Sequence, residues 1–336
     1  MRPTATQDEV DGVRRTVEEN GLEAFISVGE ERTVIGVVGK DLERVAHLGT
    51  LDGVEQVIRI SSPYKLASSE HQVERTRVRI NGVELGLGQE LVVMAGPCAV
   101  ESRDQLMETA RCVKREGARV LRGGAFKPRT SPYSFQGLGA EGLRLLAEAR
   151  EETGLPIVTE LMDVRDIADV VEVADVIQIG ARNMQNYSLL AEAGRTGIPV
   201  LLKRGLSSTL EELLMAAEYV LKEGNDSVML CERGIRTFET AYRFTLDLLA
   251  VPALRELTHL PIIIDPSHAA GRRDWVGPMS LAAAAAGADG VIVEVHNEPE
   301  QAICDGPQAL ATDVFAEYAE QVRRVAEVAG KQLTAV

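Results

Sequence analysis

Aromatic residues are scarce in this chain of 336 residues, where phenylalanine, tryptophan and tyrosine together make up 4%. Hydrophobic residues nevertheless reach 45%, so a sizeable core has to be built from aliphatic and small side chains. Strands that are buried on both faces of a parallel sheet are rich in such residues. The composition therefore suits a protein with a buried parallel sheet.

Long apolar runs are missing as well. No stretch of about 18 apolar residues lacks charge, as a membrane-spanning helix requires, and the N-terminus has no segment that resembles a signal peptide. Cysteine occurs only at positions 98, 112, 231 and 304. A chain of this length does not need disulfides for stability, so we expect a cytoplasmic protein whose reduced thiols are core residues or ligands.

Positive charge is in deficit, with 36 Lys and Arg residues against 51 Asp and Glu residues and a formal net charge of −15. This balance argues against nucleic acid or an anionic membrane as a partner. It does not argue against an anionic substrate, because a local cluster of basic residues can override the overall field.

The first part of the chain has the pattern of a small α+β domain, which we place at residues 1–62. A helix is predicted over 7–20, strands over 22–28 and 33–39, a short helix over 42–48 and a third strand over 54–60. Residues 63–76 are predicted to be a linker. A β-hairpin follows at 77–85, where Asn81 and Gly82 form the strongest short hairpin signal.

From residue 91 onward, short apolar runs alternate eight times with longer helical segments. The runs cover residues 91–95, 120–122, 156–160, 176–179, 199–203, 227–231, 261–265 and 290–294. Eight β-then-α units in roughly 240 residues predict a (β/α)₈ TIM barrel, which with the hairpin occupies residues 77–336. An open, doubly wound sheet is the alternative. In the fifth unit, Ser208 and Glu211 are predicted to form a helix-capping box.

Reactive side chains follow the predicted strands at the end where barrel enzymes carry their active sites. Cys98, His268 and Glu294 stand at three of these ends, and Asp305 follows in the loop after the eighth strand. A thiolate, an imidazole and two carboxylates suit Mn, Fe, Co or Zn. The alternative is that Cys98 is a buried thiol and Glu294 a structural ion-pair partner. The convergence of four such groups favours the divalent metal.

Basic side chains form a second set at the same strand ends: Arg122, Lys127, Arg129, Arg182, Lys203 and Arg233. Six cations around one barrel mouth would repel each other unless anions lie between them. Pairing of one or two with neighbouring carboxylates is expected, but pairing of all six is not. Guanidinium groups match phosphate and carboxylate geometry, so we predict that two phosphorylated molecules bind together.

Four motifs resemble those of the metal-dependent DAHP (3-deoxy-D-arabino-heptulosonate 7-phosphate) synthases. They are AGPC at 95–98, GAFKPRT at 124–130, IGAR at 179–182 and DPSHAAGRR at 265–273. The resemblance implies a transferase, 3-deoxy-7-phosphoheptulonate synthase, that condenses phosphoenolpyruvate with erythrose 4-phosphate and releases phosphate. This is the first step of the shikimate pathway of aromatic amino-acid biosynthesis.

The resemblance also implies roles for individual residues. The phosphoenolpyruvate site is Arg122, Lys127, Arg182, Lys203 and Arg233. The erythrose 4-phosphate site is Lys127, Pro128, Arg129, Thr130 and Asp265. The metal ligands are Cys98, His268, Glu294 and Asp305. The catalytic residues are Lys127, Glu160 and His268. Lys127 is the candidate for protonating the new alkoxide, and we expect its cationic neighbours to lower its pKa.

The N-terminal domain resembles a ferredoxin-like regulatory domain found on one branch of this family. There it binds tyrosine or phenylalanine between paired domains, which implies a regulatory site near Phe25 and Ser27 and a homotetramer. That domain normally opens with a strand, for which residues 1–6 are too short and too polar. The alternative is a domain that only stabilises an oligomer.

Three other functions are alternatives for the same set of residues. The 3-deoxy-octulosonate 8-phosphate synthases share the barrel but carry a motif resembling KANRSS where this chain has KPRT at 127–130, and they use arabinose 5-phosphate. A Schiff-base aldolase would use Lys203 as nucleophile. An amino-acid sensor with an inactive barrel is the non-enzymatic alternative, and the intact set of reactive residues argues against it.

Overall fold

A computed structural model describes residues 1–29, 32–39, 41–58, 62–86, 90–129 and 131–331. The chain divides into two compact units. The first comprises residues 1–75 with 257–259, and the second comprises residues 76–256 with 260–336.

The N-terminal unit packs one helix and a 3₁₀ segment with a two-stranded sheet. Its elements are α1 (Gln7–Glu19), β1 (Glu23–Val28), β2 (Thr33–Val38) and η1 (Leu42–Thr50). The strands are antiparallel, and α1 begins with a capping box between Thr6 and Glu9. A small aliphatic core formed by Val13, Val17, Leu22, Val45, Leu48 and Val54 holds these elements together.

The predicted third strand of this unit is wrong over the part that the structure describes. Residues 54–58 have no strand assignment, and 59–60 lie outside the described residues. Val54 joins the core, but Val57 and Ile58 are 58% and 55% exposed. A β-rich sequence becomes a strand only when it gains a pairing partner and a buried face, and these two side chains have no buried face here.

The predicted hairpin is present as β3 (Val78–Ile80) and β4 (Val83–Leu85). Asn81 and Gly82 between the strands have φ angles of 41° and 88°, as a two-residue turn with two positive φ angles requires. Its four apolar side chains belong to the same core cluster as residues inside the barrel strands. The hairpin therefore fills the N-terminal end of the barrel.

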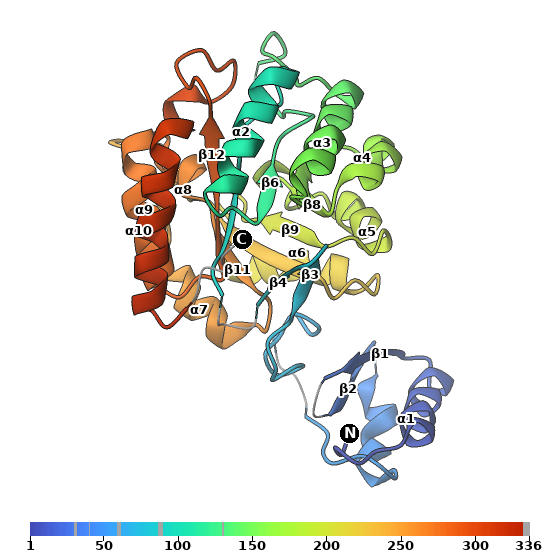
Figure 1. Cartoon of the computed structure of the whole chain (residues 1–336). Coiled ribbons are helices and arrows are strands. Elements are labelled where there is room, and N and C mark those ends of the chain that lie inside the picture. The colour runs from blue at the N-terminus through green and yellow to red at the C-terminus, as the bar shows by residue number, and fades with distance from the viewer. Residues whose placement is uncertain (30–31, 40, 59–61, 87–89, 130, 332–336) are drawn as a thin grey trace. The chain divides into compact units, whose positions relative to one another are not determined.

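Eight parallel strands close into the predicted barrel, and the helices lie outside them (Figure 1). Each strand pairs with the next, and β12 pairs with both β11 and β5 to close the ring. The strands are β5 (Val92–Gly96), β6 (Val120–Arg122), β7 (Ile157–Glu160), β8 (Val176–Ile179), β9 (Val200–Lys203), β10 (Val228–Glu232), β11 (Ile262–Ile264) and β12 (Gly290–His296).

The helices of this unit are α2 (Arg103–Arg115), α3 (Ala140–Thr153), α4 (Ile167–Val173), α5 (Tyr187–Arg195), α6 (Leu210–Leu221), α7 (Ala250–Leu257), α8 (Pro266–Ala270), α9 (Arg273–Ala285) and α10 (Phe315–Val328). Short 3₁₀ segments are η2 (Val164–Asp166), η3 (Ala181–Asn183), η4 (Gly306–Gln308) and η5 (Thr312–Val314), and β13 (Leu310–Ala311) pairs beside β12. The capping box of α6 uses Thr209 and Glu212, one residue later than predicted, because the helix begins at Leu210.

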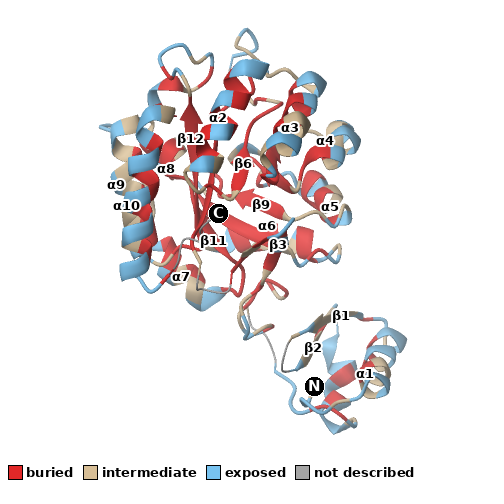
Figure 2. Cartoon of the chain, viewed as in Figure 1, coloured by how far each residue is buried: buried red, intermediate tan, exposed pale blue. Residues whose placement is uncertain are grey.

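Burial follows the layers of the barrel. In Figure 2 the barrel strands are buried along their length, whereas the helices expose their outer faces. Among the described residues, the longest and most apolar helices still fall short of what a membrane crossing requires.

Candidate active site

Seven barrel strands place an apolar side chain and then, two residues later, a polar one on the same inward face. The apolar layer consists of Val120, Val158, Val176, Leu201, Cys231, Ile263 and Ile292. The polar layer consists of Arg122, Glu160, Gln178, Lys203, Arg233, Asp265 and Glu294, all of them buried. Because side chains alternate along a strand, both layers face the barrel interior, and the polar layer lies toward the carboxyl ends.

A cavity of about 280 Å³ opens beside the polar layer. Its wall includes all six predicted cations, together with His268, Asp305 and Glu160. Further lining residues are Pro128, Ser131, Ser134, Gln178, Gly180, Ala181, Leu206, Arg243, Phe244 and Cys304. Thr130, predicted to bind the aldose phosphate, lies outside the described residues. Closure of the barrel thus gathers side chains from Arg122 to Asp305, which are far apart in the sequence.

The four predicted metal ligands fall into two overlapping groups that share Asp305. One is Cys98, Cys304 and Asp305, and the other is His268, Glu294 and Asp305. Within each group the ligand atoms lie within 4.8 Å of one another. Cys98 Sγ is 3.3 Å from an Asp305 oxygen, and His268 Nε2 is 3.3 Å from Glu294 Oε1. This mixed donor set, mostly buried, fits a borderline-soft divalent metal.

Cys304 was not predicted as part of this group. Its Sγ lies 3.3 Å from Cys98 Sγ and accepts a hydrogen bond from Arg129. The bond between the two thiols, followed by burial, raises the pKa of Cys98 well above its usual range, and the same bond lowers the pKa of Cys304. No C-x-x-C spacing marks the pair in the sequence, so only the fold identifies it.

His268 is held in place by Asp265. Asp265 caps α8 by accepting from the backbone N–H of His268 at 2.9 Å, and its other oxygen lies 2.7 Å from His268 Nδ1. A hydrogen bond at Nδ1 leaves Nε2 free to act as a ligand. Burial raises the pKa of Asp265, but His268 and Lys203 outweigh burial and hold it well below the usual range. Lys203 and Asp265 form a buried ion pair.

Glu294 is surrounded by donors on both carboxylate oxygens. Arg122 Nη1 lies 3.1 Å from Oε1, and Gln308 Nε2 donates to Oε2 at 2.7 Å. Burial raises the pKa of Glu294, but His268 and Arg122 more than offset it, so the net pKa is lowered. The carboxylate is therefore ionised and available as a ligand.

The loop that carries Asp305 depends on Glu101, which sequence reasoning missed. One oxygen of Glu101 accepts from the backbone N–H groups of Ile303 and Cys304 at 2.9 and 3.2 Å. The other lies 3.3 Å from Nε2 of His296 at the end of β12. Asp305 itself has a φ of 52°, a conformation that non-glycine residues seldom adopt unless their surroundings impose it.

The six predicted cations differ in how they are paired. Arg122 pairs with Glu294, and Lys203 pairs with Asp265. These two ion pairs agree with the prediction that one or two of the cations have acidic partners. Lys127 donates to the carbonyl of Cys98 at 3.1 Å. Arg182 is exposed at the rim.

Arg233 is the least satisfied of these cations. It is 5% exposed, and among the described residues its Nη1 is a buried atom without a hydrogen-bond partner. Its guanidinium lies over the Phe244 ring at 4.5 Å, and burial lowers its pKa. A buried donor without a partner is costly, so this atom is a natural ligand for an anion in the cavity.

The expected direction of the Lys127 pKa shift is wrong. Burial lowers this pKa, and so does the nearby Arg122. Cys98 and other acidic groups, Glu160 among them, outweigh both, so the net pKa is raised. The prediction counted the cations of the motif and not the acidic groups that other strands bring to the same place. A protonated Lys127 can still supply a proton.

Glu160 enters the cavity from β7 and accepts a hydrogen bond from Gln178 at 3.3 Å. A Cβ at position 180 would lie 2.1 Å from its carboxylate. Glycine at 180 is therefore what allows Glu160 to occupy this position.

The two candidate regulatory residues lie in the N-terminal unit. Phe25 and Ser27 are half-buried on β1. The Ser27 hydroxyl donates to Gln72 Oε1 at 2.9 Å, and Phe25 pairs across the ladder with Gly36. A ligand that used the Ser27 hydroxyl as a donor would have to displace Gln72.

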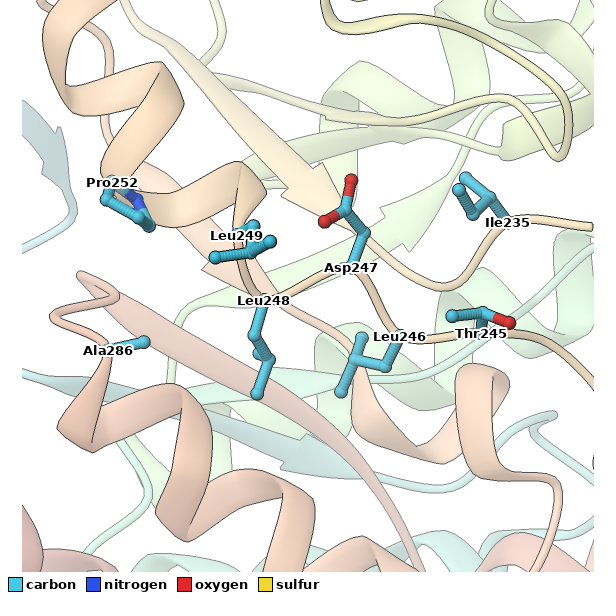
Figure 3. A pocket seen from close by; sticks show the side chains of 8 residues that line it. All are labelled: Ile235, Thr245, Leu246, Asp247, Leu248, Leu249, Pro252 and Ala286. Carbon is cyan, nitrogen blue, oxygen red and sulfur yellow. The ribbon is translucent and has the colours of Figure 1, made fainter. Parts of the chain in front are cut away.

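A second cavity of about 660 Å³ lies along the segment between β10 and α7 (Figure 3). Its lining is mostly apolar: Ile235, Thr245, Leu246, Asp247, Leu248, Leu249, Pro252 and Ala286. The one charged residue, Asp247, accepts from Arg204 at 2.8 Å. This cavity is the larger, but its lining has no cationic side chain and only one carboxylate, so the smaller one is the candidate active site.

Two family models match the chain. The model described as the DAHP synthetase I family covers residues 65–330, and the DAHP synthase ferredoxin-like domain covers residues 1–62. A phospho-2-dehydro-3-deoxyheptonate aldolase of Thermotoga maritima is 50% identical over 331 residues, which is 98% of each chain. A 2-dehydro-3-deoxyphosphooctonate aldolase of Syntrophobacter fumaroxidans is 32% identical and covers 68% of this chain and 85% of that protein.

Two solved structures are also similar to this chain. The crystal structure of the Thermotoga maritima DAHP synthase aligns with a TM-score of 0.79 at 49% identity, covering 98% of this chain and 97% of that one. A truncated form of the enzyme from the same organism aligns with a TM-score of 0.75 at 48% identity, covering 80% of this chain and 98% of its own.

Proposed function

The chain belongs to the DAHP synthetase I family, and from this premise we propose that it condenses phosphoenolpyruvate with D-erythrose 4-phosphate to give DAHP and phosphate. Its relatives with the same domain arrangement carry this activity in their names. The observation that carries the proposal is a cavity lined by the six predicted cations and by His268, Cys304 and Asp305, which belong to two overlapping groups of metal-ligating side chains.

Phosphoenolpyruvate is assigned to the cations of the polar layer and its rim: Arg122, Lys127, Arg182, Lys203 and Arg233. A carboxylate and a phosphate on one small molecule need several donors, and guanidinium groups match both. The unpartnered Nη1 of Arg233 supports the assignment, because an anion would satisfy it.

Erythrose 4-phosphate is assigned to Lys127, Pro128, Arg129, Thr130 and Asp265, of which the first three line the cavity. Arg129 is half-buried and lines the cavity beside Cys304. The resemblance implies that Lys127 lies between the two subsites, and its place in the cavity wall, with a hydrogen bond to the carbonyl of Cys98, is compatible with that role. Both phosphates would thus be held by basic side chains, which brings the reacting carbons together as a proximity effect.

Cys98, His268, Glu294 and Asp305 would hold a divalent metal, and Mn, Fe, Co or Zn suits this donor set. A metal bound there supplies Lewis-acid polarisation of the aldehyde oxygen. Asp265 orients His268 for this role, and Glu101 holds the loop of Asp305.

The proposed reaction forms one carbon–carbon bond and one carbon–oxygen bond to water, and it breaks the C2–O bond to phosphate. C3 of phosphoenolpyruvate attacks the aldehyde carbon, and the new alkoxide takes a proton for which Lys127 is the candidate donor. Water adds at C2, and the resulting hemiketal loses inorganic phosphate. Glu160, which faces the cavity from β7, is a candidate to accept the proton of that water.

Two competing activities make different demands on the same cavity. A synthase for arabinose 5-phosphate would share most of it, and the difference rests on Pro128 and Arg129 of the KPRT motif. A Schiff-base aldolase needs Lys203 as a free amine, yet Lys203 is buried in an ion pair with Asp265. An amine held in that ion pair suits a binding role better than a nucleophilic one.

The remaining parts of the proposal concern the whole molecule. We propose feedback inhibition by tyrosine or phenylalanine through the N-terminal unit, near Phe25 and Ser27, in a homotetramer in the cytoplasm. The match of residues 1–62 to the ferredoxin-like domain of this family supports regulation. The alternative, a domain that only stabilises an oligomer, predicts that neither amino acid changes the rate.

The test follows the ultraviolet absorbance of phosphoenolpyruvate with erythrose 4-phosphate or arabinose 5-phosphate, each with and without chelator. We expect consumption with erythrose 4-phosphate alone, abolished by chelator and restored by Mn²⁺ or Co²⁺. Preference for arabinose 5-phosphate would overturn the assignment of the KPRT motif. A covalent adduct trapped by borohydride would support Lys203 as nucleophile. No consumption by metal-loaded protein would favour the sensor.

A further inference from the structure

Gln308 is not among the predicted site residues, yet it contacts the carboxylate of Glu294 and the backbone of Asp305. It ends η4 and is 2% exposed. Its side-chain amide donates to Glu294 Oε2 at 2.7 Å, and its backbone N–H donates to the carbonyl of Asp305 at 3.1 Å. One residue therefore connects a ligand on β12 with a ligand in the loop that follows.

The amide orientation of Gln308 is fixed by Arg243. Arg243 Nη1 donates to Gln308 Oε1, and a guanidinium can only donate. The carbonyl oxygen of the amide must therefore face Arg243, which leaves the NH₂ group to face Glu294. Arg243 comes from the segment between β10 and α7 and also lines the cavity, so the orientation is imposed from a different strand.

The two oxygens of Glu294 thereby become unequal. Oε2 accepts the short hydrogen bond from Gln308, whereas Oε1 lies 3.1 Å from Arg122 Nη1 and 3.3 Å from His268 Nε2. A metal shared with His268 would meet Oε1. If Gln308 were absent, the carboxylate could rotate, or turn both oxygens toward Arg122, whose Nη1 is 3.1 Å from Oε1.

We propose that Gln308, oriented by Arg243, is a positioning residue that holds Glu294 as a one-oxygen metal ligand. The inference rests on the proposed function, because it takes Glu294 to be a ligand. Partners that orient a metal ligand through a hydrogen bond typically change metal affinity by about 10–100-fold when removed. Arg243 acts one bond further away, so its loss should have a smaller effect in the same direction.

The test is a titration of metal-free protein with Co²⁺ against a competing chelator, read from the thiolate-to-cobalt absorption. Gln308→Met removes the donor at similar volume, and Gln308→Glu keeps the acceptor for Arg243 but sets two carboxylates against each other. Both variants should bind Co²⁺ about 10–100-fold more weakly than wild type. Arg243→Met should bind it a few-fold more weakly.

The matched control is Gln301→Glu, which adds the same charge at an exposed position of the same loop. It should bind Co²⁺ like wild type. Thermal unfolding of each metal-free variant checks that it is folded, and if Gln308→Met is not, Gln308→Glu and Arg243→Met decide. Wild-type Co²⁺ affinity and spectrum in the folded variants would overturn the inference alone. Failure of wild-type protein to bind Co²⁺ would instead overturn the metal site of the proposed function.

Discussion

The apolar and polar layers of the barrel lie two residues apart on the same strands, yet their side chains make different kinds of interaction. Side chains of the apolar layer pack with the β3–β4 hairpin into one core. The polar layer is buried too, but it holds three cations and three carboxylates, of which Arg122 and Lys203 pair with Glu294 and Asp265. Burying charge is costly unless partners compensate for it.

The exception within the polar layer is instructive. Arg233 has a buried Nη1 without a partner among the described residues. A layer built only for stability would not keep such an atom, since hydrophobic side chains of similar volume often stabilise a protein as well or better. The comparison therefore separates residues that stabilise the fold from residues that are available to bind a ligand. Substitutions in the apolar layer should mainly change the free energy of unfolding, whereas substitutions in the polar layer should mainly change the reaction rate.

The largest effect is expected for Cys98→Ala. Loss of a metal donor removes several kcal/mol of transition-state stabilisation, which corresponds to a rate loss of about 10³-fold. Phosphoenolpyruvate consumption measures it. The control is Cys231→Ala in the apolar layer, which should keep the rate and lose about 1 kcal/mol of stability. A chelator-treated Cys98→Ala protein with the wild-type rate would remove the metal from the proposal.

Leu201→Ala tests the apolar layer. Leu201 is fully buried, and its truncation should lower the free energy of unfolding by about 3 kcal/mol through lost burial and a cavity. Urea unfolding measures this change. The folded fraction should retain its rate, because Leu201 lies one layer below the cavity. A large rate loss without destabilisation would show that the two layers are not separable.

Arg233→Met should lower kcat/KM for phosphoenolpyruvate about 10²-fold, as expected when one donor to a reacting anion is lost. The ligand-free protein should be as stable as wild type or more so, because a partly unsatisfied buried cation has been removed. Arg204→Met provides the contrast. Arg204 pairs with the buried Glu232 and the half-buried Asp247, and its loss leaves both carboxylates uncompensated. If Arg233→Met destabilised the protein as much as Arg204→Met, Arg233 would be a structural residue like Arg204 and not one kept for a ligand.

The smallest effect is expected for Glu101→Gln. The amide would no longer offer two acceptor oxygens to the Asp305 loop and His296, so metal affinity should fall about 10-fold. Co²⁺ titration measures the change. Glu108→Gln, an exposed neighbour that accepts from Asn297 at 2.9 Å, should bind Co²⁺ like wild type. Equal affinities in the two variants would show that Glu101 does not position the loop.

Each barrel strand begins within one residue of its prediction, because a buried strand is a short apolar run bounded by turn residues. The same logic failed at residues 54–58, where the apolar residues Val57 and Ile58 are exposed instead of forming a strand. The sequence pattern also placed the α6 capping box one residue too early. Local patterns locate an element well but do not reveal whether it finds a partner.

The sequence by itself determined which side chains end the strands: cysteine, histidine, carboxylates and six cations at one end of a closed sheet. Tertiary structure alone decided which of them meet. The Cys98–Cys304 contact, the Glu101 contacts with the Asp305 loop, and the Arg243–Gln308–Glu294 chain join residues with no shared local motif. The raised pKa of Lys127 has the same origin, because Coulomb interactions depend on distance in space, and barrel closure sets those distances.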